Sequence, residues 1–168
     1  TVTICYEDAA ASLDIFTEYG DPEPVQSALN AEEATFYHEL GHMVIDVYDL
    51  PTTGREEDVA DQMAAFILLQ PGEDGQVDPD SSEVVRDFAR AFAASDDDEP
   101  GESDFADTNS LNQTRMYNLQ CWIYGSDPDG NSDLVGDGAL PQDRAESCEE
   151  EYDKLDQAWS ELLDPHLR

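Results

Sequence analysis

The sequence predicts a mainly α-helical protein, although an α+β start with one short strand at the N-terminus also fits. Apolar residues recur at spacings of three and four over several long stretches, as in helices that bury one face. Clusters of proline, glycine and aspartate separate these stretches. At 168 residues and 39% hydrophobic composition, residues 1–168 suit a single domain with a sizeable core.

The expected elements follow from this periodicity and its breaks. Asn30 is the expected N-cap of the second helix, where Glu33 would complete a capping box, and Ser82 is the expected cap of the fourth. Residues 95–104 form a solvated acidic loop, and residues 125–138 form a loop rich in glycine and aspartate. The remaining elements are a strand at residues 1–6 and helices at residues 9–19, 31–48, 56–69, 81–94, 111–124 and 141–163.

The charge of the chain excludes two classes of partner. There are 41 Asp and Glu against 7 Lys and Arg, which gives a formal net charge of −34. A surface of this kind repels nucleic acid and anionic membranes. The acids are spread along the whole chain instead of forming a tail, so we expect a protein from a salt-loving organism. Its folding should weaken at low salt, because self-repulsion is then poorly screened.

The chain shows neither a signal peptide nor an apolar run near the ~20 residues of a membrane span. It starts at Thr1 without methionine, so we expect a processed or trimmed product. Three cysteines leave an odd count. Cys121 and Cys148 flank one loop-rich segment and could form a disulfide, which would place the protein outside the cytoplasm. Buried free thiols are the alternative.

The central motif of the sequence is His38-Glu39-Leu40-Gly41-His42, inside the second expected helix. Two histidines four residues apart lie on one helix face and can share a metal ion. Glu39 projects beside them, where a carboxylate can take a proton from water. This His-Glu-x-x-His pattern favours Zn²⁺ over a merely structural histidine pair.

A catalytic zinc ion needs a third protein ligand. The best candidate is Glu57, at the start of the helix expected to return beside the motif helix. Glu56 or Asp49 could take its place, because acids are abundant in this chain. Asp61, one turn after Glu57, could accept a hydrogen bond from a ligand histidine and fix its tautomer.

The motif pair resembles that of the gluzincins. The motif helix, followed by Glu57-Asp58-Val59-Ala60-Asp61, is similar to the motif pair of ImmA/IrrE-type peptidases, in which asparagine stands at the position of Asp61. A longer resemblance covers most of the chain and points to a bacterial family assigned as metallopeptidases from its motifs. This second resemblance rests on Cys5-Tyr6-Glu7, Leu50-Pro51, Gly54–Asp58, Ala60–Gln62, Tyr117-Asn118, Cys121–Pro128, Leu140-Pro141, Arg144-Ala145 and Cys148.

The resemblance implies a zincin-like helical domain built around the motif helix packed on the helix that bears Glu57. It implies Zn²⁺ bound by His38, His42 and Glu57, with Glu39 as general base. It also favours the disulfide between Cys121 and Cys148. Members of that family carry a further segment before Cys5-Tyr6-Glu7, so we expect this chain to lack an N-terminal part of its precursor that includes strands.

The expected function is a secreted or extracytoplasmic zinc peptidase that hydrolyses a peptide or protein substrate. Tyr117 is the leading candidate for stabilising the oxyanion, ahead of Arg115, Tyr124 and Arg144. Two alternatives stay open: a zinc hydrolase of a non-peptide amide, and a non-catalytic zinc-stabilised binding or surface module. The intact Glu39 disfavours the module, because a structural zinc site does not use a base.

Overall fold

The longest helix, α2, runs from Pro24 to Tyr48 and carries the whole His-Glu-x-x-His motif. The computed structural model describes residues 1–73, 75–95, 100–136 and 140–167. Nearly all regular structure in that part of the chain is helical, which confirms the predicted fold class. The other elements are α1 (Tyr6–Glu18), α3 (Glu56–Leu68), α4 (Pro79–Ala94), α5 (Glu102–Phe105), α6 (Asn112–Ser126), the 3₁₀ helix η1 (Ser132–Leu134), α7 (Gln142–Ala145) and α8 (Cys148–Leu163).

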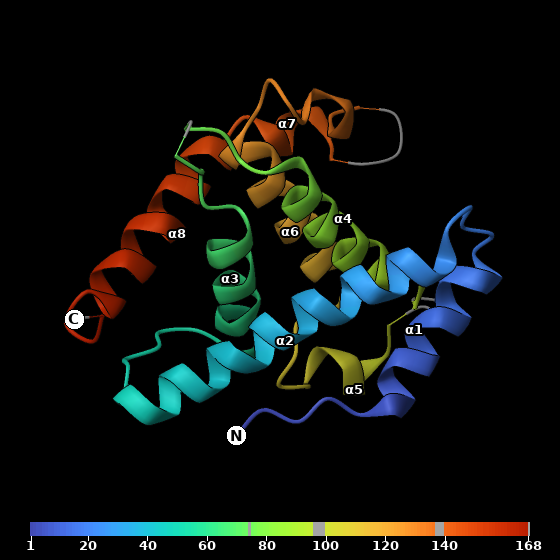
Figure 1. Ribbon diagram of the computed structural model, residues 1–168, viewed down its shortest axis with the longest axis horizontal. Coiled ribbons are helices and arrows are strands. Elements are labelled where there is room, and N and C mark those ends of the chain that lie inside the picture. The colour runs from blue at the N-terminus through green and yellow to red at the C-terminus, as the bar shows by residue number, and fades with distance from the viewer. Residues whose placement is uncertain (74, 96–99, 137–139, 168) are drawn as a thin grey trace.

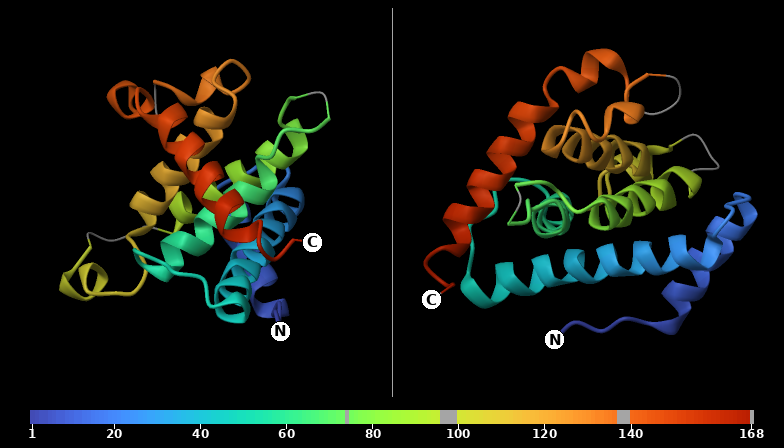
Figure 2. Two further views of the ribbon diagram at one scale, coloured as in Figure 1. Left: turned by 90° about the vertical axis from the view of Figure 1, so that its left-hand side faces the viewer. Right: turned by 45° about the horizontal axis from the view of Figure 1, so that its top comes forward.

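The helices are arranged around α2, which crosses the molecule in Figure 1. Helices α3 and α4 pack along one side of α2, and α1 folds back against its N-terminal half. Beyond α3 and α4 lies α6, which in turn packs against α8 (Figure 2). None of the described helices is long and apolar enough to cross a membrane.

The prediction of a strand at the N-terminus was wrong. Residues 1–5 precede α1 as irregular backbone, and α1 begins at Tyr6. The β pairing found in the described ranges is limited to two isolated bridges, Pro71 with Val77 and Val135 with Leu140. A β-branched segment needs a partner strand, and these residues have none in the part of the chain that is described.

The motif helix begins earlier than its predicted cap. Pro24 occupies the first turn of α2, as is common for proline at a helix start. Asn30 is therefore inside the helix, not at its end. Its side-chain amide donates to Asp87 Oδ2 on α4 at 2.8 Å, and its Oδ1 accepts from Gln26 at 2.9 Å. A tertiary partner thus satisfies the side chain that looked like a cap.

The predicted N-cap of helix α4 was wrong for the same reason. Its N-cap is Asp78, whose Oδ1 accepts the backbone N–H of Asp80 at 2.9 Å, with Pro79 at the next position. Ser82, the predicted cap, is buried in the first turns and its hydroxyl donates to Asn131 Oδ1 at 3.2 Å. Both predicted caps were therefore wrong, because Asn30 and Ser82 bond to side chains of other elements.

Further down the chain, the boundaries move by a few residues. Helix α6 runs to Ser126, two residues beyond its predicted end. The last predicted helix is two helices, α7 and α8. Within the predicted acidic loop, α5 forms a single turn, whereas residues 96–99 lie outside the described residues. The predicted loop 125–138 contains η1, and its residues 137 and 138 also lie outside the described ranges.

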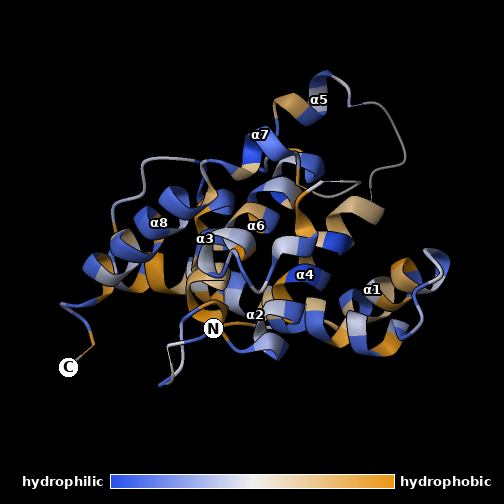
Figure 3. Cartoon of the chain, turned by 90° about the horizontal axis from the view of Figure 1, so that it is seen from above, coloured by the Kyte–Doolittle hydropathy of each residue, from blue (hydrophilic) through white to orange (hydrophobic). Residues whose placement is uncertain are grey.

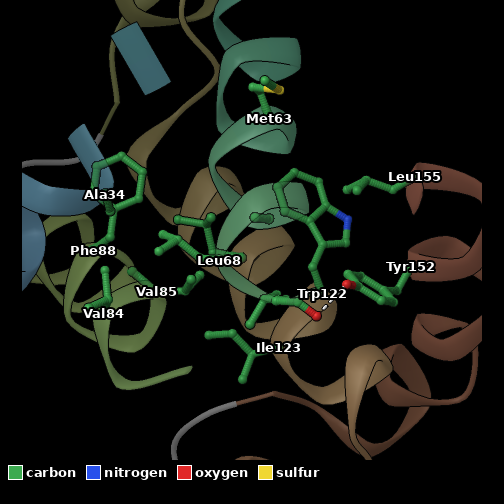
Figure 4. Packing of buried hydrophobic residues seen from close by; sticks show 14 of the residues in the cluster. Ala34, Met63, Leu68, Val84, Val85, Phe88, Trp122, Ile123, Tyr152 and Leu155 are labelled. Carbon is green, nitrogen blue, oxygen red and sulfur yellow. Dashed lines mark hydrogen bonds between the residues drawn. The ribbon is translucent and has the colours of Figure 1, made fainter. Parts of the chain in front are cut away.

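The main core fills the space between α2, α3, α4, α6 and α8. Trp122, Trp159, Tyr152 and Phe88 are its buried aromatic side chains. Figure 4 shows side chains from several helices meeting around Trp122. The Tyr152 hydroxyl donates to the backbone carbonyl of Leu69 at 2.7 Å, which links α8 to the end of α3. In Figure 3 the α8 ribbon carries both hydrophilic and hydrophobic residues, as expected of a helix with one buried face.

A disulfide joins Cys121 on α6 to Cys148, the first residue of α8, so this predicted pairing is confirmed. Both cysteines are fully buried in a second, smaller apolar cluster with Leu140 and Ala145. Gly125 lies against the backbone of Cys148, where an added Cβ would come within 2.2 Å of the carbonyl oxygen. The two helices therefore touch at backbone distance. Cys5 is a free, exposed thiol.

Four arginines join separate elements through carboxylates. Arg90 on α4 pairs with Asp21, in the turn before α2, and also with Asp87 of its own helix. The other three pairs are Arg86 of α4 with Asp133 of η1, Arg115 of α6 with Asp61 of α3, and Arg144 of α7 with Glu151 of α8. With 7 basic residues in the whole chain, these contacts use most of the positive charge.

From the ion pair between Asp21 and Arg90 we expect the fold to lose stability in acid. Burial raises the pKa of Asp21, but hydrogen bonds from the Glu23 backbone N–H and from Arg90 outweigh it, so the pKa lies below its ordinary value of 3.8. Because the pKa of Asp21 is lower in the folded state than in the unfolded state, the ionised carboxylate stabilises the fold above about pH 4. This stabilisation is lost as the pH falls through the folded-state pKa. Asp21→Asn should therefore lower the free energy of unfolding by about 1–3 kcal/mol at pH 6 and by less at pH 3.

Urea unfolding of both proteins across this pH range, at one fixed high salt concentration, checks this expectation. An equal difference between the two proteins at pH 6 and pH 3 would contradict the assigned role of Asp21.

Candidate metal centre

Helix α2 places His38 and His42 on the side that faces α3. Their Nε2 atoms are 3.2 Å apart, and the two rings meet edge to face. His38 is buried, whereas His42 is partly exposed. The spacing of four residues therefore gives the shared helix face that the sequence predicted.

The first turn of α3 brings a carboxylate to the same point. Glu57 Oε2 lies 3.4 Å from Nε2 of His38 and 3.5 Å from Nε2 of His42. One ligand atom from each of these three residues lies within 4.8 Å of the other two. The structure thus brings together the three residues that the sequence analysis selected as ligands.

Glu56 and Asp49, the alternatives to Glu57 as third ligand, make other contacts or lie at another part of the helix. Glu56 Oε1 is 2.8 Å from Nδ1 of His42, on the opposite edge of the ring from Glu57. Asp49 ends α2 in a left-handed conformation with φ of 51°. Glu56 is therefore placed to orient His42, and Glu57 is the carboxylate that faces both Nε2 atoms.

Asp61 supports His38 from the other side. Its Oδ1 lies 2.9 Å from Nδ1 of His38, and Asp61 is buried. Burial alone would raise the pKa of this carboxyl, but hydrogen bonds with Arg115 and His38 lower the pKa below its ordinary value. An ionised Asp61 accepts a hydrogen bond from Nδ1–H, which leaves the Nε2 lone pair of His38 directed at the other two ligand atoms.

The electrostatic field of this site favours positive charge. Burial lowers the pKa of His42, yet the hydrogen bond with Glu56 and the charges of Glu57, Glu56 and Glu39 together raise the pKa above its ordinary value of 6.5. The negative groups that stabilise a protonated imidazole also stabilise a bound cation in its place.

The three ligand atoms fit a tetrahedral ion. Zinc bonds of ~2.0–2.1 Å at tetrahedral angles put neighbouring ligand atoms about 3.3–3.4 Å apart. The three separations here are 3.2, 3.4 and 3.5 Å. Two imidazoles and one carboxylate leave a fourth position for water or substrate, as in catalytic zinc sites.

Glu39 lies on the solvent side of this cluster. It follows His38 in α2 and is exposed, and its charge reaches His42. An exposed carboxylate beside the ligand histidines can take up a proton and release it. The role of Glu39 as base stays a prediction from the motif.

The predicted oxyanion donors are not gathered at the cluster. Tyr117 packs against the apolar cluster around the disulfide, so its catalytic role stays a prediction. Tyr124 contacts both apolar clusters. Arg144 pairs with Glu151 on α8, and Arg115 binds Asp61. Of these four residues, Arg115 is the one with a contact to a residue of the site.

Sequence reasoning did not foresee the contacts of Arg115 and Glu56. Arg115 is 54 residues from Asp61 in the chain, so no local spacing connects them. The composition offers one general signal, since each of the 7 basic residues has many possible partners among 41 acids, but it does not identify the partner.

Comparison with known proteins agrees with this site. A search of curated proteins gave no match, and a search of solved structures gave none either. A model of the family DUF4344, described as "Putative metallopeptidase", matches residues 1–163. This match spans the ligand residues, Glu39, Asp61 and both disulfide cysteines, and on it the chain belongs to that metallopeptidase family.

Proposed function

We propose that the protein is a zinc-dependent peptidase. The observation that carries this proposal is the convergence of His38, His42 and Glu57 on one point, next to the glutamate of the His-Glu-x-x-His motif. Membership in a family described as metallopeptidases supports a peptide or protein as the substrate. The nitrogen and carboxylate donors, and their separations, support zinc as the metal.

The metal, when bound, would polarise the scissile carbonyl and make water a stronger nucleophile at neutral pH. The protein supplies the other parts of the reaction. The Glu39 carboxylate accepts the proton of the attacking water and delivers it to the leaving amine nitrogen. Asp61 and Glu56 accept hydrogen bonds at Nδ1 of His38 and His42, which orients each ring with Nε2 toward the metal position.

Two other functions would use the same three ligands, and they differ in whether they need Glu39. A zinc hydrolase of a non-peptide amide would use Glu39 in the same way, so only its substrate differs. A non-catalytic zinc-stabilised module would need the three ligands but not Glu39. The exposed position of Glu39 beside His42 therefore favours hydrolysis.

Glu39→Gln separates hydrolysis from metal binding. We expect the variant to keep its fold and its zinc, because Glu39 is not among the three ligands, and to lose about 10²–10⁴-fold in hydrolytic rate. Glu33→Gln, an exposed glutamate on the same helix, is the matched control and should keep full activity. The assay combines zinc content by elemental analysis with cleavage of a mixed peptide library. Wild-type cleavage rates in Glu39→Gln would remove Glu39 from the mechanism.

Glu57→Ala tests the third ligand. Removing a direct ligand should weaken zinc binding by more than the roughly 10–100-fold typical of outer hydrogen-bonding partners. Glu56→Gln is the comparison, and its loss should stay within that smaller range because Glu56 bonds to Nδ1 of His42. Competition with a chelator of known zinc affinity measures both. A larger loss for Glu56→Gln than for Glu57→Ala would reverse the two roles.

We also propose that the protein works outside the cytoplasm of a salt-loving organism. The disulfide between Cys121 and Cys148 supports an oxidising compartment. The net charge of −34 supports adaptation to high salt, where ions screen the self-repulsion of the surface.

The salt dependence of stability follows from the same charge. The free energy of unfolding should rise steadily between 0.1 M and 2 M KCl, since the Debye length falls from about 10 Å at 0.1 M to about 3 Å at 1 M. Thermal unfolding followed by circular dichroism measures this. A melting temperature that does not change with salt would argue against adaptation to high salt.

A further inference from the structure

Arg115 makes a largely buried ion pair with Asp61 next to the metal centre. Its Nε donates to Asp61 Oδ2 at 2.7 Å, and its Nη2 donates to Asp61 Oδ1 at 2.7 Å. The exposed fractions of the two side chains are 11% for Arg115 and 3% for Asp61. This two-point contact fixes both carboxylate oxygens, whereas a single hydrogen bond would leave the group free to rotate.

The contact continues directly to a proposed ligand. Asp61 Oδ1, which accepts from Arg115, also lies 2.9 Å from Nδ1 of His38. The order of groups is therefore guanidinium, carboxylate and imidazole. A buried carboxylate without the arginine would carry an uncompensated charge and would be free to take a proton or to turn away from His38.

Contacts with α4, and with α3 and the residue before it, hold Arg115 and the start of its own helix in position. The Phe92 ring of α4 lies against its guanidinium, 3.9 Å from ring centroid to Cζ. Ser110, just before α6, donates to Asp58 Oδ2 at 2.8 Å, and Arg55 donates to the Asn109 carbonyl. These hydrogen bonds hold the start of α6 against the start of α3. Together with the Phe92 ring, they set the position of Arg115.

The two histidines are supported unequally. Nδ1 of His42 contacts Glu56, whose side chain is 53% exposed. Nδ1 of His38 contacts Asp61, which is buried and bound at both oxygens. Of the two histidines, His38 is therefore the one whose carboxylate partner is buried and bound at both oxygens.

We propose that Arg115 is a positioning residue of the metal centre, which acts through Asp61 to hold His38 with Nε2 facing His42 and Glu57. This inference rests on the proposed metal site but not on peptide hydrolysis. Arg115 touches neither the ligand atoms nor Glu39 in this arrangement, so its effect passes through the carboxylate of Asp61.

Arg115→Met, compared with Arg144→Met, tests this role. Arg144 makes an equivalent two-point pair with Glu151, at 2.7 Å for each bond, and lies in the disulfide region. Arg115→Met should weaken zinc binding about 10–100-fold, and Arg144→Met should leave it unchanged. Unchanged affinity in folded Arg115→Met, or an equal loss in Arg144→Met, would overturn the proposal. Arg115→Lys, which keeps the charge but loses the planar fork, replaces Arg115→Met if that variant does not fold.

A metal-free readout separates this proposal from the proposed function. ¹⁵N NMR of the His38 imidazole at pH 8 should show the Nδ1–H tautomer in the wild type and a mixture of tautomers in Arg115→Met. The same spectrum in both proteins would overturn the positioning role. Wild-type protein that binds zinc but cleaves no peptide would refute the peptidase proposal alone, whereas wild-type protein that binds no zinc would refute the metal site.

Discussion

The close approach of α2 and α3 is the constraint on which the site depends. A Cβ added to Gly41 would lie 3.0 Å from the Met63 Cβ and 3.1 Å from the Ala60 Cα, so the two helices meet almost backbone to backbone. Gly41 sits between the two motif histidines, and Ala60 lies one turn after Glu57. Because the helices touch here, ligand atoms from both can converge on a single ion. A wider spacing would separate the carboxylate from the imidazoles, whatever residues were present.

This contact is stabilised from outside the helix pair. In the main core, Leu68 of α3 is grouped with residues of α4, α6 and α8, and Ala34 and Ile45 of α2 belong to the same cluster. Helix α6 also reaches the site itself through Arg115 and Asp61. The apolar packing holds the helices at the required distance, and the buried polar groups set the direction of the side chains. Both contributions are needed, since packing has little directional preference and hydrogen bonds alone would not offset the cost of burying charge.

The sequence predicted those parts of the site that depend on local spacing. His38 and His42 follow from the period of one helix, and Glu57 from the return of the next helix beside it. The errors at the starts of α2 and α4 have one physical cause, because polar side chains that resemble caps can instead bond to distant groups. Asn30 bonds to Asp87 on another helix, so the start of α2 was placed too late. The contact between Arg115 and Asp61 could not be predicted, since it depends on how α6 packs against α3.

The scarcity of basic residues gives the chain an uneven tolerance to substitution. Exposed acids are numerous and make few specific contacts, so one can replace another with little effect on the fold. Arg86, Arg90, Arg115 and Arg144 each join two separate elements, and few other cations are available to replace them. We therefore expect substitutions at most surface acids to have little effect on stability, and substitutions of these arginines to have a larger one. Their positions should be among the last to change as the rest of the acidic surface diverges.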